Sequence, residues 1–433
     1  MSQRQGLLRI YCAALLLMGV CMCYFAGCTD TARKSDNARR VLRIHLDVIG
    51  NGGRIAREFA AQYERETGIA VELISERLNS SERLTQYQQY LGARSADVDL
   101  YEIDVIWPAM LADYFVDVGP ALGKEAAEFF PPIIRNNTIG GHLTAIPFHA
   151  DAGFLYYRTD LLEKYGFEKP PQTWDELEGM AGKIQEGERA AGNANFTGYL
   201  WQGKAREGLT CNVLEWFASQ GGGRIVETDG RVTINNPRAL SALDRARKWV
   251  GGISPPNVTD LDEDETRKIF EQGNAAFMRN WSYAYSVMRA ENSPVATKFK
   301  ITQIPAGDSG HFSTLGGWQL AVSRYSRQPE EAIKLAKWLT AAPRQEIRAI
   351  QGSFLPSRPA VYETSATAAA IPQIAEMKEI LVNTVPRPSG PTTERYSEVS
   401  TLIFTRINKV LRGELEPGPA LEALDSEIKR TLQ

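Results

Sequence analysis

The chain is poor in cysteine, histidine and net charge. It has five cysteines and four histidines in 433 residues, and its formal net charge is −3 at pH 7. Cys12, Cys21 and Cys23 lie in an apolar N-terminal stretch, which leaves Cys28 and Cys211. Two cysteines form no disulfide framework, so the fold must rest on its own core. The small charge indicates no basic surface for nucleic acid, and the length suits two domains.

Several motifs of enzymes and metal sites are also missing. The sequence has no Gly-x-Ser-x-Gly elbow and no phosphate-binding loop, and Cys211 fits no zinc-ligand spacing. Residues 307–310, Gly-Asp-Ser-Gly, resemble the nucleophile loop of trypsin-like peptidases. Such a peptidase also needs a histidine base held by an aspartate on a β-barrel fold, and the four histidines follow no such arrangement. A polar turn is therefore the favoured interpretation.

One acidic segment has part of the spacing of a calcium loop. Asp260, Asp262 and Asp264 hold positions one, three and five, and Glu271 holds position twelve. Glu265, however, stands where the sharp turn of such a loop requires glycine. Acidic residues also complement the dipole at the start of a helix without any metal. We therefore expect neither a metal nor another cofactor.

The N-terminus has the features of an export signal. Arg4 and Arg9 precede an apolar stretch at 10–26, and small residues then lead directly into Cys28. The segment resembles the bacterial lipobox, in which the cysteine thiol is acylated and the preceding bond is cut, although Phe25 stands where leucine is usual. The alternative is a signal-anchor helix, because about twenty apolar residues can span a bilayer.

The lipobox resemblance predicts how the chain matures. Residues 1–27 would be removed as a lipoprotein signal peptide, Cys28 would carry the lipid, and 28–40 would form a polar tether. The protein would then be anchored at the outer face of the cytoplasmic membrane, in the periplasm where an outer membrane exists.

The remaining sequence alternates expected strands and helices. Apolar residues at 42, 44, 46 and 48 alternate with polar ones, which is typical of a strand. Thr173 with Glu176 forms a capping box that opens a helix through 184. Strand, helix, strand, helix, strand with short links indicates a parallel α/β sheet, and a second such region begins near 146. The expected strands are 41–49, 70–75, 99–107, 153–158 and 275–280, and the expected helices include 54–66, 80–91, 209–219, 236–250, 264–271 and 329–339.

Aromatic and acidic side chains gather where these strands end. Sugar recognition needs flat aromatic faces together with planar polar groups that bond to hydroxyls. A single aromatic residue is more often part of a core, but ligands of open α/β sheets lie beyond the carboxyl ends of the strands. The set therefore indicates the lining of a binding cleft. Its members are Glu102, Asp104, Trp107, His149, Asp151, Trp281, Tyr283, Tyr285 and Trp318.

Taken together, several segments resemble one family, the extracellular solute-binding proteins of carbohydrate ABC importers, and in particular their trehalose/maltose-binding branch. The resemblance extends from Leu42 to about Leu411 and depends on the order and spacing of the segments. The segments are 101–107, 146–153, 171–177, 270–281 and 316–318.

The resemblance implies an α/β protein with the two-lobed periplasmic-binding-protein fold, in which hinge strands join the lobes and the ligand lies in a cleft between them. Lobe 1 would comprise 41–147 and 284–324, and lobe 2 would comprise 148–283 and 325–433. The chain would cross between the lobes near 147–152, 281–284 and 323–326.

The resemblance also implies the ligand contacts. Asp104 and Arg83 would bond to sugar hydroxyls from lobe 1, and Asp151 would do so from the hinge, with His149 beside it. The remaining contacts would stack on the sugar or close the site: Trp281, Tyr283, Gly317, Trp318 and, from lobe 2, Arg387. His149 and the Gly50-Asn51 pair differ from residues that relatives carry, which leaves the identity of the sugar open.

The function implied is capture and delivery, not catalysis. The protein would bind a small sugar, a disaccharide or glycoside such as trehalose, maltose, sucrose or glucosylglycerol. It would pass this sugar, as a monomer, to the transmembrane subunits of an ABC permease, and nucleic acid is not an expected partner. The alternative from another class is a secreted glycoside hydrolase or lyase, which would need a carboxylate pair such as Asp104 and Asp151 about 5 to 10 Å apart.

Overall fold

A computed structural model of the chain describes residues 40–46, 50–74 and 80–433. The expected signal peptide 1–27, the lipid site Cys28 and the tether as far as residue 39 lie outside the described residues, and so do the last residues of the first two expected strands. Within the described ranges, no helix combines the length and the apolarity that a membrane span needs.

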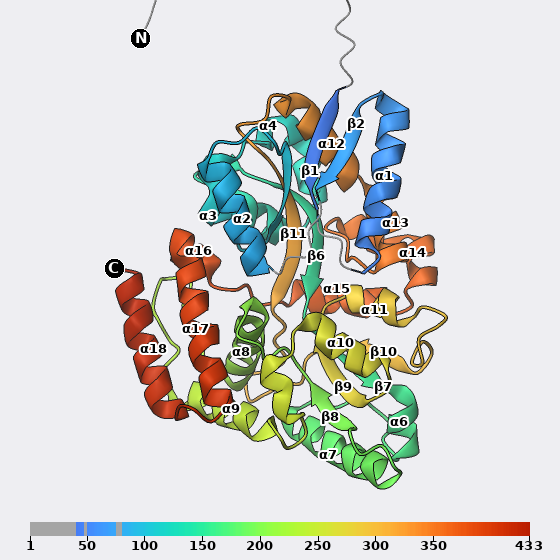
Figure 1. The fold of residues 1–433 in the computed structure, drawn as a ribbon, viewed down its shortest axis with the longest axis vertical. Helices are drawn as coiled ribbons and strands as arrows, with labels where there is room; N and C mark the ends of the chain where they lie inside the picture. Colours follow the sequence, from blue (N-terminus) through green and yellow to red (C-terminus); the bar gives the residue numbers. More distant parts are fainter. Residues whose placement is uncertain (1–39, 47–49, 75–79) are drawn as a thin grey trace, which may run out of the picture. The chain divides into compact units, whose positions relative to one another are not determined.

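The first sheet consists of five strands, β1 Val41–His45, β2 Ala70–Ile74, β3 Leu100–Asp104, β6 Ile146–Ala152 and β11 Leu315–Val322. Their order is β2-β1-β3-β11-β6 (Figure 1). The strand β1 is parallel to β2 and β3, whereas β11 is antiparallel to β3 and β6. The connecting helices are α1 Gly52–Thr67 and α2 Ser80–Gly92, so the expected strand–helix–strand order is confirmed.

Helix α1 illustrates how the sequence places an element on this sheet. Ile55, Phe59 and Tyr63 recur every four residues, so they share one face of the helix, and all three are buried. Gly68 ends the helix in the left-handed conformation at φ 73°, where its N–H donates to the Glu64 carbonyl at 2.8 Å. A buried stripe and a glycine stop thus define this helix in the sequence.

The second sheet consists of four strands, β7 Phe154–Arg158, β8 Thr197–Leu200, β9 Ala275–Asn280 and β10 Phe299–Thr302. Their order is β10-β7-β9-β8, with β7 antiparallel to both neighbours and β8 parallel to β9. Helix α7 Trp174–Ala190 packs on β8, and α8 Glu207–Gln220 packs on α9 Pro237–Trp249. The chain therefore forms the two α/β lobes that were expected.

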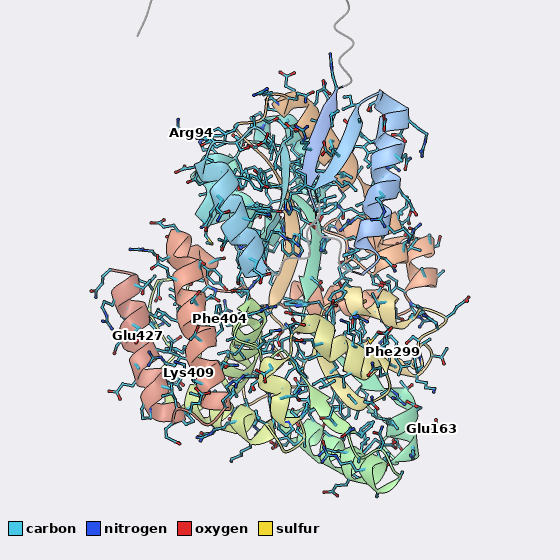
Figure 2. The ribbon with its side chains drawn as sticks, viewed as in Figure 1. Arg94, Glu163, Phe299, Phe404, Lys409 and Glu427 are labelled. Atoms are coloured by element: carbon cyan, nitrogen blue, oxygen red, sulfur yellow. The ribbon has the colours of Figure 1, made fainter. Side chains whose placement is uncertain are left out.

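The helices α17 Tyr396–Leu411 and α18 Pro417–Thr431 lie side by side and pack on α8 and α9 (Figure 1). An ion pair between Arg406 Nη2 and Glu427 Oε1 at 2.6 Å joins them; Glu427 is labelled in Figure 2. Four residues of α17 at helical spacing belong to the core of the second lobe: Val399, Ile403, Ile407 and Val410.

The expected capping box at the start of α7 forms in a modified way. Thr173 Oγ1 accepts the N–H of Glu176 at 3.2 Å, as the motif predicts. The Glu176 carboxylate accepts the N–H of Gln172 at 2.6 Å, one residue before the donor that the motif predicts. The helix begins where the sequence indicates, and one additional residue is drawn into its cap.

Two of the expected lobe boundaries are wrong. Residues Phe299–Thr302, expected in lobe 1 with the rest of 284–324, form β10 and pair with β7 of the second sheet. The range 325–433, expected in lobe 2, begins with α12 Pro329–Thr340 and α13 Ala342–Gly352. Helix α12 packs on β6 and β11, and α13 packs on α1. Strand pairing and helix packing decide lobe membership, and neither is visible in a local pattern.

Within residues 80–433, three segments cross between the two lobes. Gly153 joins β6 to β7, residues 303–314 join β10 to β11, and residues 383–395 lead from α15 Ile374–Val382, which packs on β6, to α17. The expected crossing at 147–152 therefore covers most of β6 itself, and the chain crosses immediately after this strand, at Gly153. The crossings expected near 281–284 and 323–326 are misplaced, because the chain returns to the second sheet in β10 and stays with the first lobe after β11.

Candidate ligand-binding site

Asp104 is the last residue of β3 and lies at the carboxyl end of the parallel strands of the first sheet. Its Oδ1 accepts a hydrogen bond from Arg387 Nη2 at 2.7 Å, and its Oδ2 accepts one from Ser80 Oγ at 3.2 Å. Both members of the ion pair are buried. Two predicted contacts that are 283 residues apart in the chain are thus brought together.

Arg387 is held on its other side by Glu207, which sequence reasoning missed. Arg387 Nη1 donates to Glu207 Oε1 at 3.0 Å, and the hydroxyls of Tyr396 and Ser400 donate to the same carboxylate. Burial raises the pKa of Glu207, and the positive charge of Arg387 opposes that rise. An acid in the first turn of α8 is equally well explained by the helix dipole, so no signal in the sequence singles it out.

One donor of Arg387 is still unused. Its Nε is buried and has no hydrogen-bond partner among the described residues. A buried donor without a partner is costly, and a hydroxyl oxygen would satisfy it.

Trp318 and Arg83 lie next to Asp104. The sheet register places Trp318 opposite Asp104 on the neighbouring strand, so the two side chains share one face of the sheet. The guanidinium carbon of Arg83 lies 4.5 Å from the centroid of the Trp318 ring. Trp107 meets the same ring in a T-shaped arrangement at 5.5 Å. Three predicted contacts of lobe 1 are therefore neighbours.

Gly317 acts through its backbone. Its φ is 117°, and a Cβ at this position would lie only 2.5 Å from the carbonyl oxygen of His149. The register of β11 against β6 also shifts between Trp318 and Gln319, which marks a bulge. The close approach of the two strands at Gly317 thus sets the position of the Trp318 ring.

Asp151 lies near the end of β6, just before Gly153. Its Oδ1 accepts the backbone N–H groups of Ala152 at 2.8 Å and Ser282 at 3.1 Å. Burial raises the pKa of this carboxyl to about 7, and the two backbone N–H groups oppose that rise. The carboxyl therefore keeps its proton to a higher pH than a free aspartic acid does, which no sequence pattern indicated.

Trp281 follows β9 and is half-buried. Its ring lies over the guanidinium carbon of Arg279 at 4.0 Å from the ring centroid. It also lies against Gly316, where a Cβ would come within 2.8 Å of the ring. The same hypothetical Cβ would lie 3.3 Å from Asp151 Cβ, so Trp281 and Asp151 approach the same point of β11.

His149 and Tyr283 have partners of their own. Burial holds the pKa of His149 well below its usual range, so the ring is neutral and its Nδ1 accepts from Arg348 Nη2 at 3.0 Å. The Tyr283 hydroxyl donates to Asp264 Oδ1 at 3.3 Å, and its ring belongs to the core that includes the first sheet. Tyr283 thus presents less open ring face than Trp281 does.

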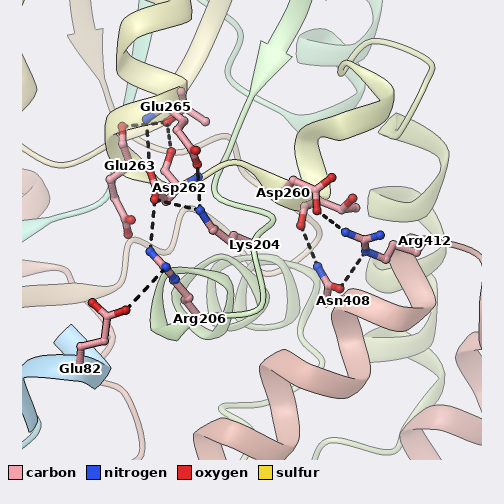
Figure 3. Close-up of polar contacts among 11 residues, drawn as sticks. Glu82, Lys204, Arg206, Asp260, Asp262, Glu263, Glu265, Asn408 and Arg412 are labelled. Atoms are coloured by element: carbon pink, nitrogen blue, oxygen red, sulfur yellow. Dashed lines mark hydrogen bonds and ion pairs between the residues drawn. The ribbon is translucent and has the colours of Figure 1, made fainter. Parts of the chain in front are cut away.

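The acidic segment before α10 Glu263–Glu271 is engaged by basic side chains (Figure 3). Asp262 caps the helix in a reciprocal capping box with Glu265, and Lys204 Nζ lies 3.4 Å from Asp262 and 3.3 Å from Glu265. Asp260 pairs instead with Arg412. The calcium-loop spacing is therefore divided between a helix cap and separate ion pairs.

Arg206 extends this network toward the first lobe. Its guanidinium lies 3.3 Å from Asp262 and, through Nη2, 3.9 Å from Glu82 Oε1 on α2 (Figure 3). Arg206 immediately precedes Glu207, and Glu82 immediately precedes Arg83. At the start of α8, the exposed ion pair of Arg206 with Glu82 therefore lies next in sequence to the buried ion pair of Glu207 with Arg387.

Residues 307–310 form the polar turn that was expected. Gly307 and Gly310 form a backbone bridge, and Ser309 N–H donates to the Ser219 carbonyl at 2.8 Å. The neighbouring His311 bonds to the Ile304 carbonyl at 2.8 Å and to Gln303 at 3.1 Å.

Two cavities lie elsewhere in the described part of the chain. One, of about 190 Å³, is lined by Gln303, His311, Glu376 and Glu379 among others. The other, of about 400 Å³, lies beside α7 and Trp249. Neither is lined by a residue that the sequence predicts to contact the ligand.

Sequence comparison relates the chain to transport proteins. Residues 49–346 match the family described as bacterial extracellular solute-binding protein. A probable ABC transporter-binding protein of Deinococcus radiodurans is 43% identical over 391 residues, which is 90% of this chain and 93% of that protein. A mannitol-binding protein of Pseudomonas aeruginosa is 27% identical over 234 residues, which is 53% of this chain and 50% of that protein.

Comparison with solved structures extends the similarity to both lobes. The maltose-bound MalE3 of T. maritima has a TM-score of 0.86 and 34% identity to this chain, and the match covers 90% of this chain and 99% of that one. The two-lobed solute-binding fold expected from the sequence is thereby confirmed. The chain belongs to the bacterial extracellular solute-binding protein family.

Proposed function

We propose that this protein binds a small sugar or sugar alcohol outside the cytoplasmic membrane and delivers it to an ABC importer. The observation that carries the proposal is the 2.7 Å ion pair of Asp104 with Arg387, which joins the first lobe to a crossing segment. A carboxylate supplies acceptors and a guanidinium supplies donors, and neighbouring hydroxyls of a sugar use both. The names of two relatives, one mannitol-binding and one maltose-bound, support this ligand class.

The proposed mechanism divides the ligand contacts between the lobes. Asp104 and Arg83 bond to hydroxyls from the first lobe, Arg387 bonds from the crossing segment, and Trp281 stacks on the apolar face of a sugar ring. Only the closed arrangement makes all contacts, so the ligand shifts the population toward closure, and the permease subunits then engage the closed form. Asp151 adds a hinge contact, and Trp318 bounds the site. Specificity comes from the cost of leaving a buried carboxylate without its partner.

The favoured ligands are disaccharides or glycosides of the size of maltose, with trehalose, maltose, sucrose and glucosylglycerol as the first candidates. Titration calorimetry with these sugars and with mannitol tests the proposal. Arg387→Gln should weaken the best ligand about 10- to 100-fold, because it removes charge-assisted hydrogen bonds. Arg412→Gln is the matched control, since it also removes a guanidinium paired with an aspartate, but Arg412 is exposed at the end of α17. The affinity of this variant for the sugar should equal that of the native protein.

Two results would contradict the proposal. The first is that none of these ligands binds, and the second is that Arg387→Gln binds as tightly as the native protein. Release of glucose from maltose during the titration would instead favour the glycoside hydrolase alternative.

We also propose that Cys28 anchors the protein through a lipid. Cys28→Ser should move the protein from the membrane fraction of cells to the soluble fraction, because the acylated thiol is lost. Retention of the variant in the membrane fraction would favour the signal-anchor alternative.

A further inference from the structure

A buried ion pair lies beneath the candidate site. Arg279 on β9 and Glu215 on α8 are 0% and 1% exposed. Arg279 Nη2 donates to Glu215 Oε1 at 2.6 Å, and its Nε donates to Oε2 at 3.1 Å, so both sides of the fork are used. Burying two charges is expensive even when they are paired. An apolar pair would fill the same volume at lower cost, so the position of these charges calls for a reason beyond core stability.

The Arg279 guanidinium has its orientation fixed on all sides. Besides the two bonds to Glu215, its Nη1 donates to Gln202 Oε1 at 3.3 Å. Gln202 Nε2 in turn donates to the Arg279 carbonyl at 2.8 Å. The guanidinium is therefore held rigidly, and its Cζ lies 4.0 Å from the centroid of the Trp281 ring.

The Glu215 carboxylate contacts two crossing segments. Its Oε1 accepts the N–H of Thr314, the last residue of the segment that leads to β11, at 3.0 Å. A Cβ at Gly153 would lie 2.2 Å from the same oxygen and 2.7 Å from Arg279 Nη2. Glycine at position 153 is therefore explained by the closeness of the ion pair to the first crossing segment.

Backbone hydrogen bonds also link the third crossing segment to the other two. Gly153 N–H donates to the Thr314 carbonyl at 3.3 Å, and Leu315 N–H donates to the Val385 carbonyl at 2.9 Å. Val385 is two residues from Arg387. The ion pair therefore lies where the three crossing segments meet.

We propose that Glu215 and Arg279 are positioning residues that hold the Trp281 ring in its ligand-contacting orientation at the junction of the lobes. The inference rests on the proposed function, because it assumes that Trp281 stacks on a sugar. Arg279 supplies the flat surface on one side of the indole, and Glu215 fixes that surface relative to the crossing segments. Lysine at position 279 would preserve the charge but has no planar group to lie against the ring.

The test is a double-mutant cycle between positions 279 and 281, measured by titration calorimetry with maltose and with trehalose. Arg279→Lys should lower the affinity about 3- to 30-fold when Trp281 is present, which corresponds to the loss of a partly buried cation–π contact. In the Trp281→Ala background the same substitution should change the affinity by less than about 2-fold. A purely structural role predicts equal losses in both backgrounds, and that result would overturn the inference.

A second arginine–tryptophan stack provides the matched control. The Arg344 guanidinium carbon lies 4.1 Å from the centroid of the Trp338 ring, and Arg344 also pairs with Glu66 on α1. Arg344→Lys makes the same chemical change away from the candidate site and should leave the affinity for both sugars unchanged. An equal loss in Arg344→Lys would mean that any weakened arginine–tryptophan stack lowers binding, which would also overturn the inference.

The proposed site and the positioning role of Arg279 can be refuted separately. If Trp281→Ala binds maltose and trehalose as the native protein does, the proposed site is wrong. If Trp281→Ala weakens binding but Arg279→Lys does not, the site stands and the positioning role is wrong. Should Arg279→Lys not fold, Glu215→Gln carries the same cycle, because it keeps the shape of the side chain while removing the charge that orients Arg279.

Discussion

Replacing Asp151 with asparagine should remove a pH dependence of stability from the native protein. Asp151 is 8% exposed, and burial raises the pKa of its carboxyl to about 7. Asparagine keeps the oxygen that accepts the N–H groups of Ala152 and Ser282, so the exchange changes the charge and little else. Arg279 is the positive charge that lowers this pKa, and it is unaltered in the variant.

The size and sign of the effect follow from linkage between protonation and folding. The unfolded carboxyl has a pKa of about 3.9, so the difference of about 3 units corresponds to about 4 kcal/mol. Between these two pKa values the folded protein holds a proton that the unfolded chain has lost. This contribution to stability is therefore full at low pH and is lost as the pH rises toward about 7. Above about pH 7 both the folded and the unfolded protein have lost this proton, so the group no longer changes the free energy of unfolding as the pH rises.

Urea unfolding of the native protein and of Asp151→Asn at a series of pH values measures the effect. The stability of Asp151→Asn relative to the native protein should increase by about 2 to 3 kcal/mol between about pH 5 and about pH 8. A difference that stays constant over this range, or that decreases, would show that the pKa of Asp151 is not raised in the folded protein. Comparing two proteins at each pH cancels the titration of all other groups that the substitution leaves alone.

Substitutions at Gly316, Arg206 and Cys211 test three other contacts. Gly316→Ala should weaken maltose binding about 10-fold in titration calorimetry, because the added Cβ would lie 2.8 Å from the Trp281 ring. Gly179→Ala is the control: no atom lies within 4 Å of its added Cβ, so the affinity for maltose should be unchanged. Arg206→Gln should change maltose affinity by less than about 5-fold and reduce the dependence of that affinity on salt, because the 3.9 Å pair with Glu82 is exposed. An unchanged dependence of affinity on salt concentration would count against a role for this pair in bringing the lobes together. The Cys211 thiol is buried, and burial raises its pKa. A thiol reagent should therefore label it slowly in the native protein and fully in concentrated denaturant, measured as the difference from Cys211→Ser. Fast labelling of the native protein would show that the core around Cys211 opens readily.

The sequence predicted those features that are local. Alternating apolar residues located β1, and apolar residues at helical spacing located α12. The start of α7 was predicted from a hydroxyl and a carboxylate three residues apart. For β1 and α12 the pattern and the structure have the same period, because an element that packs on a core by one face must bury that face.

The lobe boundaries and the supporting residues of the site could not be predicted in this way. The strand β10 is four residues long and carries no sign of which sheet it will join. Glu207 and Glu215 are far apart in the sequence from Arg387 and Arg279, the residues that they hold, and ordinary acidic residues occur throughout the chain. Arg279 is two residues from Trp281, but no sequence pattern shows that its side chain lies over that ring. Asp104 and Arg387 were each named as ligand contacts by resemblance to a family, and their ion pair was not predicted.

The place of β11 in the first sheet has a consequence for synthesis and folding. This strand lies between β3 and β6, yet it follows every strand of the second sheet along the chain. A nascent chain that ends before Leu315 therefore exposes two unpaired strand edges, which are templates for aggregation. Completing the sheet requires contacts of long sequence separation, which makes folding slow. The first sheet therefore stays incomplete until most of the chain has been made. Fragments cut between the lobes should not fold on their own.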